Sequence, residues 1–167
     1  MKKQNFEIVK GTCGNATTFE VVEGELLEVK EIPNIQFFIR KINNGYWNIS
    51  EVKSGLEVFT DKTKKAVIQK LINYELEHPS IIKQCVDNAR SIDEQKARLK
   101  KINELEDEFT RIFNFEMPKC YFTGGIDIIK LDEKLGTNRL DGISMNDYII
   151  NKYGQRASEI VDALISV

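Results

Sequence analysis

Residues 35–50 read IQFFIRKINNGYWNIS, and this stretch decides the fold class. Two β-prone runs, Ile35–Ile42 and Tyr46–Ser50, flank Asn43-Asn44-Gly45. Asn-Gly between such runs is the strongest short-range signal for a hairpin, because both residues tolerate a positive φ. The sequence therefore predicts two antiparallel strands joined by a tight turn.

Further β-prone runs on both sides extend this hairpin. Phe6–Val9, Thr17–Val22 and Leu26–Val29 precede it, and Leu56–Phe59 follows it after a turn at Ser54-Gly55. The connections are too short for the crossover helices that parallel strands need. We therefore expect an antiparallel meander over the first sixty residues or so.

Beyond Thr60 the apolar residues recur every three or four positions, as in an amphipathic helix. They are Ala66, Val67, Ile68, Leu71, Ile72, Tyr74 and Leu76. Thr60 is the expected N-cap, and the helix should end at His78-Pro79 because a residue before proline disfavours the helical conformation. This helix is expected to cover one face of the sheet.

A second helical pattern runs from Ser80 to about Phe115. The first expectation is one continuous helix of about 35 residues, roughly 50 Å long. The alternative is a break near Ser91, because Ser91-Ile92-Asp93-Glu94 fits a capping box. The apolar spacing does not keep a heptad, so a long coiled coil is not expected.

The last fifty residues mix predicted strands and helices. Lys119–Phe122 and Ile126–Leu131 are expected as strands, Ser144 as the N-cap of a short helix closed by Gly154, and Ala157–Ile165 as the last helix.

Together these patterns predict an α+β fold. It comprises an antiparallel β-meander packed by an amphipathic helix, then a long helix or helical hairpin, then a small C-terminal β/α lobe. The corresponding segments are residues 1–78, 79–116 and 117–167.

Composition makes several function classes less favourable, although a local patch can still bind nucleic acid. The net charge of −2 comes from 24 Lys and Arg against 26 Asp and Glu, so no whole-chain field favours nucleic acid. The three cysteines, Cys13, Cys85 and Cys120, have no metal-ligand or redox spacing. The chain has no secretory signal and no apolar run of about 20 residues, so we expect a cytoplasmic protein without a membrane segment.

Residues for catalysis are scarce. His78 is the only histidine, and its position before Pro79 favours a capping role at a helix end. Thr123-Gly124-Gly125 lacks the lysine of a phosphate loop and the third glycine of a dinucleotide turn. We expect no catalytic residue, metal or cofactor, and therefore no enzyme.

A basic cluster opens the first long helix and consists of Lys62, Lys64, Lys65 and Lys70. Thr63-Lys64-Lys65-Ala66 after a hairpin and a third strand resembles the second half of a double-stranded-RNA-binding domain. That resemblance implies that these lysines contact phosphates. The helix that precedes the sheet in that family is missing here, as is its histidine-bearing loop. The alternative is a helix start that is merely solvated.

An acidic cluster lies on the second and third predicted strands and the loop after them. It consists of Glu20, Glu23, Glu25, Glu28 and Glu31, against Lys30 as the only nearby cation. Since nothing local compensates these carboxylates, they can present an anionic ridge to a basic protein groove. The alternative is a set of solvated charges that protects a sheet edge from aggregation.

The stretch from Phe37 through Leu56 to Ala66 resembles a small module of uncharacterised proteins from phages and integrative elements. The shared motif is Trp-x-Ile/Val-Ser/Thr-Glu-x-x-Ser/Thr-Gly followed by a lysine-started helix, here Trp47-Asn48-Ile49-Ser50-Glu51-Val52-Lys53-Ser54-Gly55 and Thr63-Lys64-Lys65-Ala66. The match covers about 40 residues, and proteins with this module include anti-restriction and anti-CRISPR inhibitors as well as accessory factors.

The resemblance implies a non-enzymatic, protein-binding inhibitor or accessory protein of a phage or mobile element. Its expected partner is a host or defence-system protein in the bacterial cytoplasm, such as a nuclease with a basic groove. A nucleic-acid-binding module that uses the lysines at the helix start is the alternative.

Overall fold

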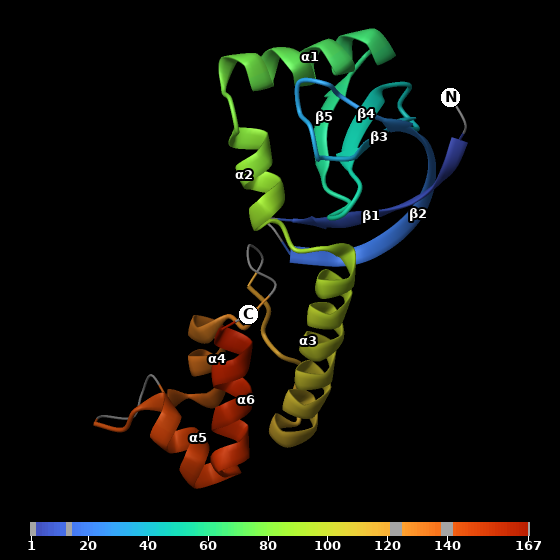
Figure 1. Ribbon diagram of the computed structural model, residues 1–167. Helices are drawn as coiled ribbons and strands as arrows, with labels where there is room; N and C mark the ends of the chain where they lie inside the picture. The colour runs from blue at the N-terminus through green and yellow to red at the C-terminus, as the bar shows by residue number, and fades with distance from the viewer. Residues whose placement is uncertain (1–2, 13–14, 121–124, 138–141, 167) are drawn as a thin grey trace. The chain divides into compact units, whose positions relative to one another are not determined.

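The computed structural model describes residues 3–12, 15–120, 125–137 and 142–166 (Figure 1). The chain forms two compact units. One is built from Met1–Gly11 and Ala16–Lys96, and the other from Thr12–Asn15 and Ala97–Val167. The first unit holds a five-stranded antiparallel sheet, and the second is mainly helical, so the predicted α+β class is confirmed.

The strands follow one another in the sheet in chain order. They are β1 (Lys3–Thr12), β2 (Asn15–Leu27), β3 (Phe37–Lys41), β4 (Trp47–Glu51) and β5 (Glu57–Asp61). The predicted hairpin is confirmed, because β3 and β4 pair antiparallel with Lys41 opposite Trp47. Gly45 has the positive φ of +86° that its turn requires.

The runs Thr17–Val22 and Leu26–Val29 were expected as separate strands. Instead, one strand, β2, contains the first run and continues to Leu27, and Glu28 and Val29 follow it. Gly24 lies inside β2 rather than in a turn. A Cβ on Gly24 would be 3.0 Å from the Phe38 ring and 3.2 Å from the Ile39 carbonyl oxygen. The glycine therefore lets β2 approach β3 closely, which is the other common role of glycine in a strand.

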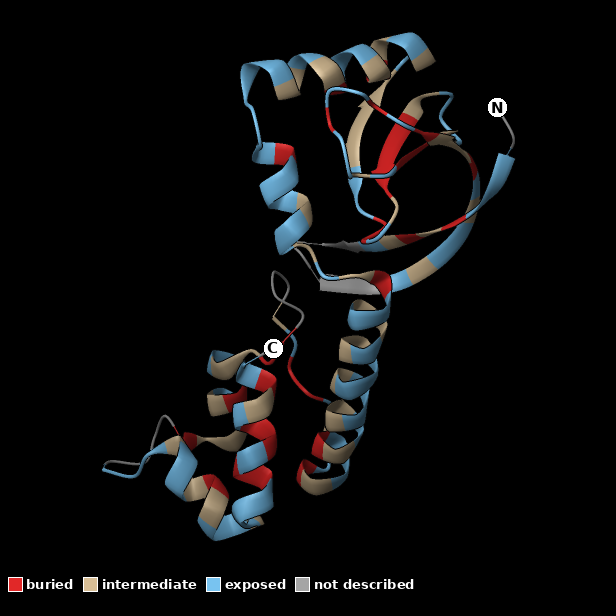
Figure 2. Ribbon diagram, in the orientation of Figure 1, coloured by how far each residue is buried: buried red, intermediate tan, exposed pale blue. Residues whose placement is uncertain are grey.

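Both faces of the sheet are covered. On one face Phe37, Ile39 and Ile49 pack with residues of the first two helices. On the other face Phe38 packs with Phe6 and Ile8 of β1, and the Phe6 and Phe38 rings stack 4.2 Å apart. The long strands β1 and β2 are strongly curved, as Figure 1 shows. Most of β4 is buried (Figure 2).

Helix α1 (Lys64–Glu77) is the predicted amphipathic helix and buries Val67 and Leu71. The expected N-cap at Thr60 is wrong, because β5 continues to Asp61. Thr63 caps the helix instead, and its hydroxyl oxygen accepts the Ala66 N–H at 3.1 Å. The predicted end at His78 is confirmed, since His78 is the C-cap.

The continuous helix expected after Ser80 is wrong, and the alternative with a break is confirmed. The segment forms α2 (Ile81–Asn88) and α3 (Ile92–Phe113), with Ala89 in an extended conformation between them. The capping box closes as the sequence suggests: Glu94 accepts the Ser91 N–H at 2.7 Å, and Ser91 Oγ accepts the Glu94 N–H at 3.3 Å.

The second unit packs α3 residues against α4 (Ile128–Leu135), α5 (Met145–Tyr153) and α6 (Gln155–Ile165). Its fully buried residues include Phe109, Leu131, Ile149, Ile160 and Leu164, and Figure 2 shows the buried face of α6.

The strand predicted over Ile126–Leu131 is wrong, because Asp127 caps α4 by accepting the Lys130 N–H at 3.2 Å. Ile126 forms an isolated bridge to Lys119, the first residue of the other strand predicted here, Lys119–Phe122. Residues 121–122 of that predicted strand lie outside the described residues, as do Thr123, Gly124 and Cys13. The short helix capped by Ser144 and closed at Gly154 and the last helix are confirmed.

Candidate functional site

Three members of the acidic cluster have lysine partners in the folded chain. Glu23 pairs with Lys3 at 2.6 Å, Glu20 pairs with Lys10, and Glu25 pairs with Lys64 at 2.5 Å. The Lys10 ammonium lowers the pKa of Glu20, and the Lys64 ammonium lowers the pKa of Glu25. These carboxylates lack neighbouring cations along the sequence, but β1 and α1 supply them across the fold.

The other two members, Glu28 and Glu31, lie in the connection between β2 and β3. Both are exposed, and neither forms an ion pair within the described part of the chain. The acidic cluster is therefore a surface of mixed charge on β2, followed by two free carboxylates. Its role as a partner-binding ridge stays a prediction.

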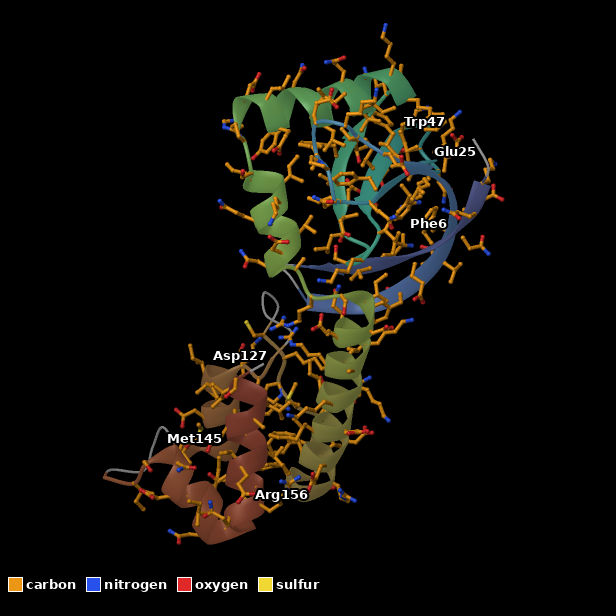
Figure 3. The ribbon with its side chains drawn as sticks, viewed as in Figure 1. Phe6, Glu25, Trp47, Asp127, Met145 and Arg156 are labelled. Carbon is orange, nitrogen blue, oxygen red and sulfur yellow. The ribbon has the colours of Figure 1, made fainter. Side chains whose placement is uncertain are left out.

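The basic cluster is divided in the same way. Lys64 pairs with Glu25, and its ammonium lies 5.5 Å from the centre of the Trp47 ring. Figure 3 labels Glu25 and Trp47. The Lys70 ammonium lies 5.6 Å from the centre of the Phe59 ring. Lys62 and Lys65 are exposed, and no side-chain partner of either is found among the described residues. The acidic cluster and the basic cluster thus meet at the Lys64–Glu25 pair. Lys62 and Lys65 are the two lysines of the basic cluster that can bind an anion from outside the described chain.

The turn between β4 and β5 carries the Glu-x-x-Ser-Gly part of the motif. Glu51 is only 3% exposed, and its carboxylate accepts the N–H groups of Lys53 and Ser54, both at 2.7 Å, and the Ser54 hydroxyl at 2.5 Å. Sequence reasoning assigned a tight turn to Ser54-Gly55 but missed this carboxylate. The sequence signal for this role is the position of Glu51 two and three residues before the N–H groups of Lys53 and Ser54, since an acidic side chain commonly accepts backbone N–H groups at that spacing.

This turn also covers the edge of the sheet at β1. The Gly55 carbonyl accepts the Val9 N–H at 3.3 Å, and a Cβ on Gly55 would lie 2.9 Å from the Glu7 carbonyl oxygen. The first residues of α3 join it there, since Lys96 pairs with Glu7 at 2.6 Å. One edge of the sheet is therefore closed at Glu7–Val9.

The opposite edge, at β5, is bordered by an apolar groove. The groove has a volume of about 310 Å³ and lies between β5 and α2. Its apolar lining consists of Leu56, Val58, Phe59, Tyr74, Ile81, Ile82, Cys85, Val86 and Ala89. Leu56 is 40% exposed and Ile81 39% exposed. No local pattern indicates this groove, because it depends on where α2 packs after the chain turns at His78-Pro79.

Among the further hollows of the same unit, two lie close to this groove. One, of about 420 Å³, shares Phe59 and Tyr74 with the groove and adds Asp61 and Glu77. The other, of about 850 Å³, lies between residues 28–36 and α2, and its rim mixes Glu28, Lys30, Lys53, Lys83 and Asp87. Lys83 and Asp87 pair with each other at 2.6 Å, so the larger hollow has no dominant charge or apolar character.

Nothing in the described residues points positively to catalysis. His78 is exposed at the end of α1, where its backbone N–H donates to the Tyr74 carbonyl at 2.8 Å and its ring lies 4.9 Å from that of Tyr74. Within the described ranges, no group of three or more His, Cys, Asp or Glu side chains is placed to hold a metal ion. In the same ranges, no helix has the length and apolar character needed to cross a membrane.

Comparison of the chain with protein-family models, with curated proteins and with solved structures found no match.

Proposed function

We propose that this chain is a non-catalytic, protein-binding inhibitor or accessory protein of a phage or mobile element. The observation that carries the proposal is the open β5 edge beside an apolar groove, because an unpaired strand edge with exposed apolar side chains is a frequent site of protein recognition. The resemblance of residues 37–66 to the phage module supports the biological setting. The most specific form of the proposal is inhibition of a host nuclease with a basic groove.

The test is an affinity experiment with the immobilised full-length chain and lysates of several bacterial species. We expect a protein to be retained and to elute with the chain, and mass spectrometry identifies it. The retained protein is then assayed alone and with the chain, and an inhibitor lowers its activity in proportion to occupancy. Retention of nucleic acid without protein, or of nothing from any lysate, would contradict the proposal.

The acidic cluster is tested best at Glu28 and Glu31, because neither carboxylate has an ion-pair partner among the described residues. Reversal of Glu20, Glu23 or Glu25 would also break a pair with a lysine, so lost binding could reflect lost folding. If the ridge meets a basic groove, the double variant Glu28→Lys/Glu31→Lys weakens retention of the partner. Unchanged retention would remove the ridge from the interface.

A second candidate function is nucleic-acid binding at the start of α1, favoured by the free ammonium groups of Lys62 and Lys65. The logarithm of the affinity for a double-stranded RNA probe falls linearly with the logarithm of the salt concentration, and the slope steepens with each phosphate that a lysine neutralises. Lys62→Ala/Lys65→Ala should reduce that slope, and Lys100→Ala/Lys101→Ala on α3 is the matched control. Equal binding by both double variants would exclude this function.

A further inference from the structure

The two edges of the sheet differ in what covers them. At β1 the Val9 N–H is used by the Gly55 carbonyl, and Glu7 is paired with Lys96. Among the described residues, β4 is the only strand beside β5, and no backbone hydrogen bond joins Glu57–Asp61 to a segment other than β4. An unpaired edge presents a row of N–H and C=O groups that another extended chain can use.

The side chains beside this edge are arranged for an extended segment. Phe59 lies in both the groove toward α2 and the hollow toward α1, and Tyr74 packs against it with ring centres 5.4 Å apart. Leu56, just before β5, and Val58 and Phe59 of β5 therefore give the groove apolar surface, which Glu57 also borders. Because side chains alternate across a strand, an added strand places every second residue over this surface.

Charge at the ends of β5 argues against a second copy of this chain as the occupant. If β5 paired antiparallel with itself about Phe59, Glu57 of each copy would face Asp61 of the other. Like charges directly opposite each other in a sheet are destabilising. The same carboxylates favour a partner segment that carries Lys or Arg. Glu77 also lines the hollow toward α1, and among the described residues Lys70 is the one cation that lines either that hollow or the groove.

We propose that β5 binds an extended segment of a partner protein as a sixth strand, with apolar side chains at alternate positions in the groove between β5 and α2 and with basic residues toward Glu57 and Asp61. This proposal rests on the protein-binding function proposed above and names the site and the chemistry of the segment. Strand addition supplies affinity through main-chain hydrogen bonds, and the groove supplies selectivity for the side chains.

The first experiment selects a random library of peptides of about nine residues, displayed on phage, against the immobilised full-length chain. We expect enrichment of sequences with apolar residues at alternate positions and with Lys or Arg. Failure to enrich any sequence, or enrichment of acidic sequences without alternation, would overturn the proposal.

A selected peptide is then synthesised with N-methyl groups at residues of one parity or of the other. Only alternate N–H groups of an added strand face β5. We therefore expect methylation at one parity to weaken binding at least about tenfold and methylation at the other parity to be tolerated. Equal effects at both parities would exclude strand addition.

The protein variants use a matched pair on α2. Cys85 is exposed and lines the groove, whereas Gln84 is exposed and does not line it. Cys85→Arg places bulk and a positive charge in the groove and should abolish binding of the peptide, while Gln84→Arg makes the same charge change on the same helix and should preserve it. Glu57→Lys is expected to weaken binding of the peptide, and Asp107→Lys, at an exposed position on α3, is expected to leave it unchanged.

The thiol of Cys85 reports occupancy without any substitution. Alkylation of Cys85, followed by peptide mapping, should slow when the selected peptide is added to the wild-type chain. An unchanged alkylation rate at saturating peptide would place the peptide elsewhere and overturn the proposal.

The two proposals fail in different ways. If lysate proteins are retained equally by wild type, Cys85→Arg and Gln84→Arg, the protein-binding function stands and the β5 site is wrong. If the parity-dependent peptide binds but no lysate protein is retained, the β5 site stands and the protein-binding function has failed its own test.

Discussion

Glu51 is buried, and its carboxylate accepts three hydrogen bonds from the turn that follows it. The same turn is tied to two other segments. The Val52 N–H donates to the carbonyl of Gln36, just before β3, at 2.9 Å, and the Ile92 N–H at the start of α3 donates to the Lys53 carbonyl at 3.0 Å. One buried side chain therefore holds a turn on which three segments of the first unit converge.

Glu51→Ala should lower the free energy of unfolding of the first unit by about 2–4 kcal/mol, because it leaves buried donors without an acceptor. Glu28→Ala, at an exposed position in the preceding connection, should change it by less than about 0.5 kcal/mol. Urea unfolding of both variants checks this. Equal stability of Glu51→Ala and wild type would show that the turn does not need the carboxylate.

Gly55 and Gly45 separate two costs of adding a Cβ. Both have a positive φ, +68° and +86°, but nothing lies within 4 Å of a Cβ built on Gly45, whereas one on Gly55 meets the Glu7 carbonyl oxygen at 2.9 Å. Gly45→Ala should cost about 1–2 kcal/mol from backbone strain alone. Gly55→Ala should cost clearly more, because β1 must also move. Denaturant midpoints compare the stability of the two variants. Equal losses of stability would mean that β1 moves away from the added Cβ at no cost.

At the scale of elements, the break between α2 and α3 depends on a local cap and on contacts from elsewhere. Ser91 and Glu94 form the capping box, and the Ser91 hydrogen bonds lower the pKa of Glu94. Gln95 adds a hydrogen bond to the Ser54 carbonyl at 3.0 Å. The start of α3 is thereby tied to the turn between β4 and β5.

Ser91→Ala should destabilise the start of α3 by about 1 kcal/mol, the usual cost of losing an N-cap hydroxyl. Hydrogen exchange should speed up in the first turn of α3 and remain unchanged near Phe113. Ser80→Ala is the matched control, because Ser80 precedes α2 but makes no side-chain capping bond. Faster exchange along the whole of α3 in the Ser91 variant would contradict a purely local role.

At the scale of the whole molecule, each unit has its own apolar core and its own ion pairs. In the second unit, Arg156 of α6 binds Glu108 of α3 through two hydrogen bonds, 2.9 and 2.7 Å long. The Arg156 guanidinium lowers the pKa of Glu108 below its ordinary value of 4.5. Folding therefore favours the ionised carboxylate.

The stability from this pair is fully present above the unfolded pKa near 4.5 and is lost as the pH falls through the lowered folded pKa. Glu108→Gln should therefore lower the Tm by a few degrees at about pH 7, and the difference from wild type should shrink as the pH falls below 4.5 and vanish once the folded carboxylate is protonated. Glu104→Gln is the control, since that exposed side chain lies 3.9 Å from Lys100. A difference for Glu108→Gln that persists in acid would contradict the ion pair as its cause.

Local chemistry in the sequence determined the elements with strong short-range signals. Asn-Gly between β-prone runs predicted the β3–β4 hairpin, proline predicted the end of α1, and Ser144 with Gly154 predicted the bounds of α5. These signals act within a few residues, so they need no knowledge of distant segments. The strand expected at Ile126–Leu131 failed because the capping carboxylate of Asp127 outweighs a short β-prone run.

Only the tertiary structure decided the surfaces. It brought Lys3, Lys10 and Lys64 to the glutamates of β2, closed the edge at β1 with the turn at Gly55, and formed the groove between β5 and α2. The sequence allowed either a capping box at Ser91 or one continuous helix. In the structure the helix is broken before α3, and the start of α3 is hydrogen-bonded to the carbonyls of Lys53 and Ser54. Such contacts join residues far apart in the chain, and local spacing holds no information about which distant segments will meet.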